Sequence, residues 1–244
     1  MLFNSFLWQI TILMASAGYF HTDPPRGNYP ERDHIMAKTD LRIIKTLKQI
    51  DCALLDSLKV CPFHKITVEM LCKNALINRS TFYKYYLDKY DLLEKYLRKT
   101  LDEFRENINV EFINAEPSTI HNISYIKNFE AALTFIAEKK EIYEILWSTS
   151  LDQPVFNEMT RIVHDNILAT MKPVADRTPQ KEKCADLYAH LFASNMMSLI
   201  LWWFKYYDTV SMKDIEEIMT DNMHLGLFRT FKIQMKKEQP RTPR

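Results

Sequence analysis

Hydrophobic residues recur along this chain at intervals of three and four, which is the spacing of positions on one face of an α-helix. The first clear stripe consists of Ile43, Leu47, Ile50, Leu54 and Leu58. Long helices are predicted over residues 40–58, 92–112, 119–139, 154–171, 180–207 and 212–235, with a short one over residues 142–147. The pattern therefore predicts an all-α protein.

Two shorter helices joined by a tight turn are predicted between residues 66 and 86. Thr67 is a good N-cap for the first helix, with Glu69 in the first turn, where the helix dipole favours an anion. Phe82 and Tyr86, four residues apart in the second helix, are expected to point into the core. The opposite side of that helix carries Arg79, Ser80, Tyr83 and Lys84. A helix with such a face fits the major groove of DNA, whereas the alternative is an ordinary helical hairpin with a tyrosine-rich face.

Residues 39–97 resemble the DNA-binding domain of the TetR/AcrR family of transcriptional regulators. The family pattern T-[FL]-Y-x-[HY]-[FY] reads TFYKYY over residues 81–86, and the following D-K-x-x-L-L reads DKYDLL over residues 88–93. In that second run, Asp88 is predicted to cap a helix, with Asp91 three residues on as in a capping box. One departure is Leu76, which stands in the turn where the family commonly has glycine. If that position requires a positive φ, the leucine costs about 1 kcal/mol or more.

The resemblance implies a set of DNA contacts on these helices. Base readout would fall mainly to Arg79 and Lys84, and phosphate positioning to Thr67, Tyr85 and Lys89. The whole predicted set is Thr67, Arg79, Ser80, Thr81, Tyr83, Lys84, Tyr85 and Lys89. Its partner would be a double-stranded DNA operator.

Charge is divided unevenly along the chain. Residues 36–98 contain 12 Lys and Arg against 7 Asp and Glu, a net +5, whereas residues 99–244 contain 18 against 21, a net −3. A basic head and an acidic body are expected of a protein whose head alone binds phosphates. We therefore predict a three-helix helix-turn-helix domain over residues 36–98 and a larger helical regulatory and dimerisation domain over residues 99–235. A polar tail over residues 236–244 completes the chain.

Residues 187–204 form a run of eighteen residues without a formal charge. His190, Ser194, Asn195 and Ser198 argue against a transmembrane helix in this run. The resemblance implies that the last two long helices pair with their copies in a second subunit, so that the protein is a homodimer. The residues assigned to that interface are Leu191, Met197, Ile200, Trp203, Ile215 and Met219.

Aromatic residues of the second domain are candidates to line a pocket for a small neutral or hydrophobic effector. They are Tyr125, Phe129, Trp147, His164, Tyr188 and Phe192. Aromatic stripes at helical spacing also form ordinary cores, and this alternative applies to the whole set.

The first 35 residues do not fit this organisation. Residues 2–20 carry no charge and include Ala15-Ser16-Ala17, which is similar to a signal-peptidase site, but the region lacks the early Lys or Arg of a secretory signal. We expect translation to start at Met36, which would make residues 1–35 a non-native or disordered extension. A membrane anchor, a cleaved signal and a folded N-terminal helix are the alternatives.

Cys52, Cys61, Cys72 and Cys184 show no CxxC spacing and are expected to be reduced, buried thiols of a cytoplasmic, nucleoid-associated protein. The dispersed histidines include no HExxH motif, so no metal or other cofactor is expected, and no constellation of catalytic groups predicts an enzyme. The sequence predicts a DNA-binding transcriptional regulator, a repressor released by a small ligand. The alternatives are a protein of the same fold controlled by a protein partner, and a membrane-anchored regulator.

Overall fold

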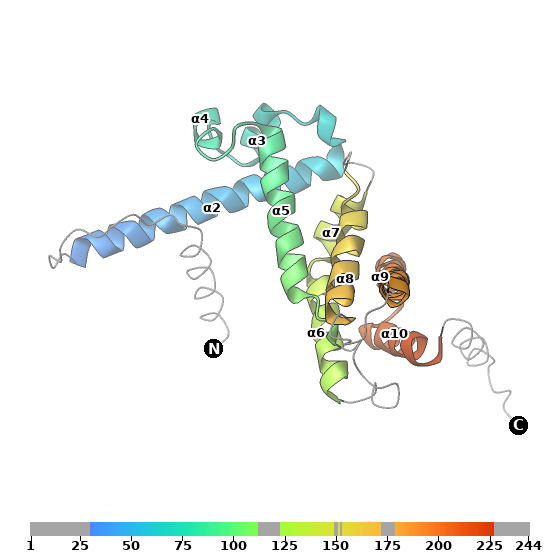
Figure 1. Cartoon of the computed structure of the whole chain (residues 1–244). Coiled ribbons are helices and arrows are strands. Elements are labelled where there is room, and N and C mark those ends of the chain that lie inside the picture. Colours follow the sequence, from blue (N-terminus) through green and yellow to red (C-terminus); the bar gives the residue numbers. More distant parts are fainter. Residues whose placement is uncertain (1–29, 112–122, 149–150, 152, 172–178, 227–244) are drawn as a thin grey trace, which may run out of the picture. The chain divides into compact units, whose positions relative to one another are not determined.

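The computed structural model describes residues 30–111, 123–148, 151, 153–171 and 179–226. Every regular element within these ranges is a helix (Figure 1), which confirms the predicted all-α class. In chain order the helices are α2 (Pro30–Val60), the 3-10 helix η1 (Phe63–Lys65), α3 (Val68–Asn74), α4 (Arg79–Phe82), α5 (Lys89–Asn107), α6 (Ile123–Glu138), α7 (Lys140–Trp147), α8 (Val155–Met171), α9 (Pro179–Lys205) and α10 (Met212–Leu225).

The chain divides into two compact units, residues 1–45 and residues 46–244, and the division falls inside α2. This helix begins at Pro30, ten residues before its predicted start. Proline is tolerated there because the first turn of a helix leaves its N–H groups unpaired. The apolar segment 2–20 and the polar tail 236–244 lie outside the described residues. The domain boundary expected near residue 98 stays a prediction.

The helix-turn-helix region is built on the apolar stripe of α2. Ile50, Leu54 and Leu58 are fully buried, as the spacing predicts. Leu71 of α3 and Phe82 of α4 belong to the same buried cluster and are fully buried as well. The short helices α3 and α4 are therefore fixed by the side chains that they bury in this cluster, because so few turns would not hold a helix alone.

Helix α5 begins where the sequence predicts a cap. A carboxylate oxygen of Asp88 accepts hydrogen bonds from the backbone N–H groups of Tyr90 at 2.8 Å and Asp91 at 2.9 Å. The carboxylate of Asp91 accepts from the N–H of Leu87 at 2.9 Å, one residue further back than a capping box requires. From this start α5 continues for nineteen residues and packs against α8.

The body, which we define as helices α6 to α10, is centred on the pair formed by α8 and α9. Trp203 of α9 is buried, and its indole N–H donates to the carbonyl oxygen of Val210 at 3.0 Å. Helix α10 begins as predicted, with a capping box between Ser211 and Asp214. It ends at Leu225, because Gly226 follows with a φ of 76° and leaves the helical conformation, and residues 227–235 of the predicted helix lie outside the described residues.

None of the helices in the described ranges combines the length and the apolar character needed to cross a bilayer. The uncharged run 187–204 belongs to α9, which buries one side within the protomer. All four cysteines are free thiols, and Cys72 is buried as expected. The expectation of a buried thiol is wrong for Cys52 and Cys184, which are exposed.

Candidate nucleic-acid interface

The turn between α3 and α4 has the hydrogen bonds of a Schellman motif. The N–H of Leu76 donates to the carbonyl oxygen of Lys73 at 3.2 Å, and the N–H of Ile77 donates to that of Cys72 at 3.0 Å. Leu76 has a φ of 55°, and it is the only non-glycine residue with a positive φ among those described. Its side chain is 86% exposed, so no burial compensates for the left-handed conformation. The strain that the sequence predicted for a leucine at this glycine position is therefore present.

Helix α4 is a single turn, shorter than the sequence suggests. Asn78 occupies its N-cap position, but the Asn78 side chain makes no capping hydrogen bond. After the helix, the N–H of Tyr85 donates to the carbonyl oxygen of Phe82 at 3.0 Å in a tighter turn. Phe82 and Tyr86 are buried as predicted, with ring centroids 5.5 Å apart. These two rings anchor the segment and leave its other side to solvent.

Seven of the eight predicted DNA contacts lie on or beside α3 and α4, which pack against each other. Five are exposed, namely Thr67, Arg79, Ser80, Tyr83 and Lys84, and two are half-buried, namely Thr81 and Tyr85. The side chain of Lys84 has no hydrogen bond or ion pair with any residue that the structure describes, so its ammonium group is available to an external anion. The hydroxyl oxygen of Thr67 accepts from the N–H of Met70 at 3.2 Å, which leaves the hydroxyl hydrogen to donate to a phosphate.

Arg79 makes an ion pair that sequence reasoning did not anticipate. Its guanidinium nitrogen Nη2 lies 2.6 Å from Oε2 of Glu69, on the neighbouring helix α3. Both side chains are largely exposed. The pair involves one of the five N–H donors of the guanidinium group, so the others can still reach a base edge.

Lys89 has partners that the sequence did not predict. The sequence assigns it to a phosphate, but its ammonium group donates to the backbone carbonyl oxygens of Phe63, His64 and Ile66, at 3.1, 3.0 and 2.8 Å. An ammonium group has three donors, so these three carbonyls use all of them. The pattern "lysine in the first turn of a helix" does not reveal such a contact, because the carbonyls belong to a loop more than twenty residues earlier.

Most of the predicted dimerisation residues are covered within a single protomer. The exposed fraction is at most 3% for Met197, Ile200, Trp203, Ile215 and Met219, so these side chains offer little surface to a second subunit. Only Leu191 of the predicted set is on the surface, at 54%. The large apolar side chains that α9 exposes are instead Leu187, Tyr188, Leu191, Leu201 and Trp202. The uncharged run has two apolar sides, and sequence spacing alone did not show which of them the protomer covers.

Of the predicted effector residues, those with described side chains line neither the groove between α6 and α10 nor the small cavity in the core. Trp147 belongs to an aromatic stack, with ring centroids 5.5 Å from Tyr143 and 5.3 Å from Phe204. Tyr188 is exposed, whereas Phe192 packs against the core. Tyr125 and Phe129 lie on α6, but their side chains are outside the described part of the structure. Trp147 and Phe192 are half-buried and pack against the core, as in the alternative of ordinary packing.

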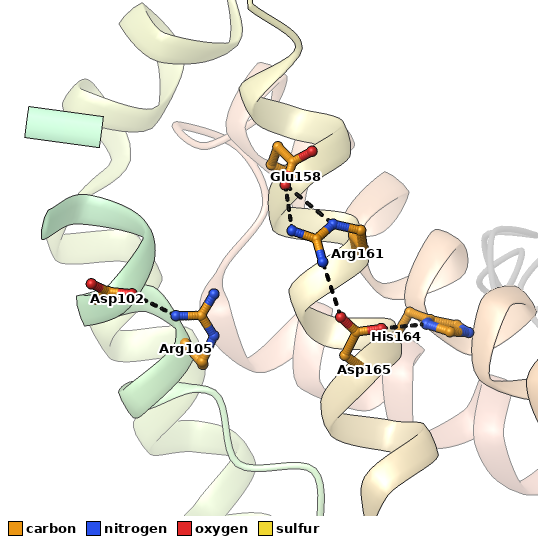
Figure 2. Close-up of polar contacts among 6 residues, drawn as sticks. All are labelled: Asp102, Arg105, Glu158, Arg161, His164 and Asp165. Atoms are coloured by element: carbon orange, nitrogen blue, oxygen red, sulfur yellow. Dashed lines mark hydrogen bonds and ion pairs between the residues drawn. The ribbon is translucent and has the colours of Figure 1, made fainter. Parts of the chain in front are cut away.

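His164, another predicted effector residue, is held by two carboxylates. Its Nδ1 lies 3.0 Å from Asp165 and its Nε2 lies 3.2 Å from Asp186 of α9. Figure 2 shows that Asp165 also faces Arg161, which in turn pairs with Glu158, so that a chain of charges runs along α8. Both ring nitrogens of His164 are therefore engaged, and the ring acts as a polar link between α8 and α9.

Within the described residues, two of the cavities border on the body, and the second of them also reaches α5. The first is an open groove of about 510 Å³ between α6 and α10, lined by Glu130, Met212, Lys213, Glu216, Glu217, Thr220 and Asp221. Burial, followed by the nearby charge of Glu130, raises the pKa of Glu216 in this groove. The second is a cavity of about 20 Å³ in the apolar core, lined by residues that include Phe104, Ile136, Met196, Met197 and Met219. Its volume is close to that of one water molecule.

Comparisons with known proteins gave one match to the body and one to most of the chain. Residues 124–225 match the family model TetR_C_8, described as a transcriptional regulator C-terminal region. The chain is also 23% identical over 157 residues to "Uncharacterized HTH-type transcriptional regulator YxbF" of Bacillus subtilis (strain 168). That alignment covers 64% of this chain and 38% of the relative, so the chain spans well under half of the relative's length. The family match falls on α6 to α10, whereas the sequence motifs over residues 81–93 lie in the helix-turn-helix region.

Proposed function

We propose that this chain, which belongs to the TetR family of transcriptional regulators, binds a double-stranded DNA operator as a homodimer and acts as a repressor that a small ligand releases. The observation that supports DNA binding most strongly is the outward-facing set on or beside α3 and α4, in which the Lys84 side chain has no partner within the described residues and Arg79 is exposed. Such a surface on a short helix pair fits a major groove.

The contacts would divide into two classes. Arg79 and Lys84 would read base edges, where a bidentate contact to a guanine is worth about 1–3 kcal/mol of discrimination. Thr67 and Tyr85 would position the domain on phosphates, with Ser80, Thr81 and Tyr83 completing the contact set. The long charged side chains are assigned to base edges because they can reach into the groove. Phosphate contacts carry little sequence information, so they are assigned to the residues that position the domain.

Dimerisation would use the exposed side of α9. Tyr188, Leu191 and Trp202 of this side are 43–56% exposed in a single protomer. An apolar stripe of this kind on one long helix is typical of a surface that a partner covers. Two recognition segments about 34–36 Å apart would then enter successive major grooves.

Selection from a pool of random duplex DNA with the wild-type protein tests the proposal. We expect a recovered operator whose binding the Arg79→Ala/Lys84→Ala variant loses. The matched control is Arg105→Ala/Arg161→Ala, which also removes two positive charges, but from α5 and α8 instead (Figure 2). Equal operator binding by wild type and the Arg79/Lys84 variant would exclude this surface as the DNA-binding site.

Control by a protein partner is the second candidate function. The apolar cavity of about 20 Å³ favours it, because an interior space of this size holds no effector without rearrangement, and the groove of about 510 Å³ between α6 and α10 is lined mostly by charged residues. Ligand control would require this Met-lined region to open, which flexible methionine side chains allow. A screen of small hydrophobic compounds for operator release and for a shift in melting temperature distinguishes the two: ligand control predicts compounds that do both, and partner control predicts none.

A further inference from the structure

The Lys89 side chain connects the first turn of α5 to the loop that leads into α3. Its ammonium nitrogen donates to three carbonyl oxygens of that loop, at distances of 2.8–3.1 Å. The same nitrogen lies 4.9 Å from the ring centroid of Phe63 and 5.2 Å from that of Tyr90. These two rings also meet edge to face, with centroids 5.4 Å apart. Lys89 is thus surrounded by carbonyl oxygens and aromatic rings on a half-buried site.

Moving this ammonium group to a phosphate would break all three hydrogen bonds. The carbonyl oxygens of Phe63 and Ile66 are partly buried, so they would lose a charged donor without full access to water. Lys84 offers the contrast, because its ammonium group is exposed and has no partner among the described residues. At Lys84 a phosphate would therefore displace no existing partner of the ammonium group. At Lys89 it would have to displace three carbonyl oxygens.

The loop that Lys89 holds fixes the start of α3. Ile66, the third acceptor, precedes Thr67, the N-cap whose hydroxyl closes the first turn of α3. At its other end α5 packs against α8 of the body. The Lys89 contact therefore joins the start of the helix-turn-helix to α5, and α5 in turn packs against the body.

We propose that Lys89 is a positioning residue that sets the orientation of α3 and α4 relative to α5, and that it does not bind a phosphate. The proposal rests on the proposed function, because its consequence is a change in operator binding. Loss of the Lys89 contact would leave every DNA-contacting side chain in place on α3 and α4 and would loosen their attachment to α5.

Salt dependence separates a positioning residue from a phosphate ligand. Each lost phosphate contact lowers the slope of log K against log salt by about 0.9 for duplex DNA. We expect Lys89→Met to weaken binding of the selected operator at least about tenfold, with an unchanged slope and unchanged binding of a scrambled duplex. We expect Lys84→Met, the charge-matched control, to reduce the slope because an exposed cation leaves the DNA surface, and to weaken the selected operator more than the scrambled duplex because Lys84 is assigned to base edges. Lys89→Arg, which keeps a cation and donors at this position, should recover part of the operator affinity.

A reduced slope for Lys89→Met, with weaker binding of the scrambled duplex, would overturn the proposal. So would wild-type operator affinity in a folded Lys89→Met protein. If Lys89→Met does not fold, acetylation of the wild-type protein by an N-hydroxysuccinimide ester provides the second measurement. Mass spectrometry should find Lys89 slowly modified with and without operator, and Lys84 rapidly modified alone and protected by operator. Rapid modification of Lys89 in the free protein, with protection on operator, would contradict the proposal.

Failure of the proposed function gives a different result. If no duplex is selected by the wild-type protein, DNA binding itself fails, and the acetylation of free Lys89 still measures whether its ammonium group is engaged. If an operator is selected and Lys89 behaves as Lys84 does, DNA binding holds and the positioning role is wrong.

Discussion

Glu69 and Arg79 form an ion pair across the turn of the helix-turn-helix, with Oε2 of Glu69 2.6 Å from Nη2 of Arg79. Their side chains are 75% and 61% exposed, and pairs this exposed contribute about 0–1 kcal/mol to stability. The pair joins the first turn of α3 to the first residue of α4. The pair therefore matters for the orientation of Arg79 more than for stability, because it holds the guanidinium group over the surface proposed to meet DNA.

Glu69→Ala is expected to relax base preference at the position that Arg79 reads, because the freed guanidinium group samples more directions. Overall affinity for duplex DNA should rise, since an acidic group leaves the interface. Competition binding to operators with single base changes measures both effects. Glu94→Ala, which breaks the exposed Glu94–Arg98 pair on α5, is the charge-matched control and should leave base preference unchanged. Unaltered preference in Glu69→Ala would show that Glu69 does not orient Arg79.

Leu76→Gly is expected to raise the free energy of unfolding by about 0.5–1 kcal/mol. Glycine removes a left-handed strain of about 1–2 kcal/mol, and the greater flexibility of the unfolded chain offsets part of the gain. The exposed leucine side chain loses no packing on removal. Urea denaturation measures the change, and Leu87→Gly is the control, because Leu87 is 83% exposed but has no positive φ. Leu87→Gly should destabilise the protein, and destabilisation by Leu76→Gly would contradict the strain argument.

Trp202→Glu is expected to convert a dimer into monomers. Trp202 lies on the exposed side of α9, so the substitution leaves the core of the protomer unchanged and introduces two charges into the proposed interface. Light scattering at micromolar concentration, with circular dichroism to check folding, measures the outcome. Leu87→Glu, which changes an exposed leucine far along the chain from α9, should stay dimeric. A monomeric wild type, or a dimeric Trp202→Glu protein, would exclude this side of α9 as the interface.

Asp91→Asn is expected to destabilise the protein at neutral pH and to have a smaller effect in acid. The N–H of Leu87, and then the ammonium group of Lys95, hold the pKa of Asp91 below its ordinary value. A lowered folded-state pKa contributes stability above the unfolded pKa of about 3.9, and that contribution is lost as the pH falls through the folded-state value. The difference in unfolding free energy between wild type and variant should therefore shrink below about pH 4. A difference that stays constant from pH 7 to pH 3 would show that the charge of Asp91 contributes nothing.

Much of the helix-turn-helix region could be predicted from local sequence. Thr67 and Asp88 cap their helices because the hydrogen bonds of a cap join residues two or three apart. Phe82 and Tyr86 face the core because residues four apart share a side of a helix. The positive φ of Leu76 followed from comparing one position with a family pattern that commonly has glycine there.

The partners of charged side chains could not be predicted in this way. Lys89 reaches carbonyls more than twenty residues earlier, and Arg79 meets Glu69 across a turn. A lysine in a first turn is compatible with a phosphate and with a carbonyl, and only the approach of another segment decides between them. The residues around the 20 Å³ cavity were missed for the same reason, since they come from several separate helices.

The sequence by itself determined the helical class and the caps at Thr67 and Asp88, because these depend on residues within a few turns of one another. Only the tertiary structure decided which side of α9 is buried: Met197 and Ile200 face the protomer core, whereas Leu191 and Trp202 face outward. All four are large and apolar, so their spacing predicts burial for each. The choice among them depends on which side of α9 the other helices of the body cover, and that is a property of packing that no single helix carries.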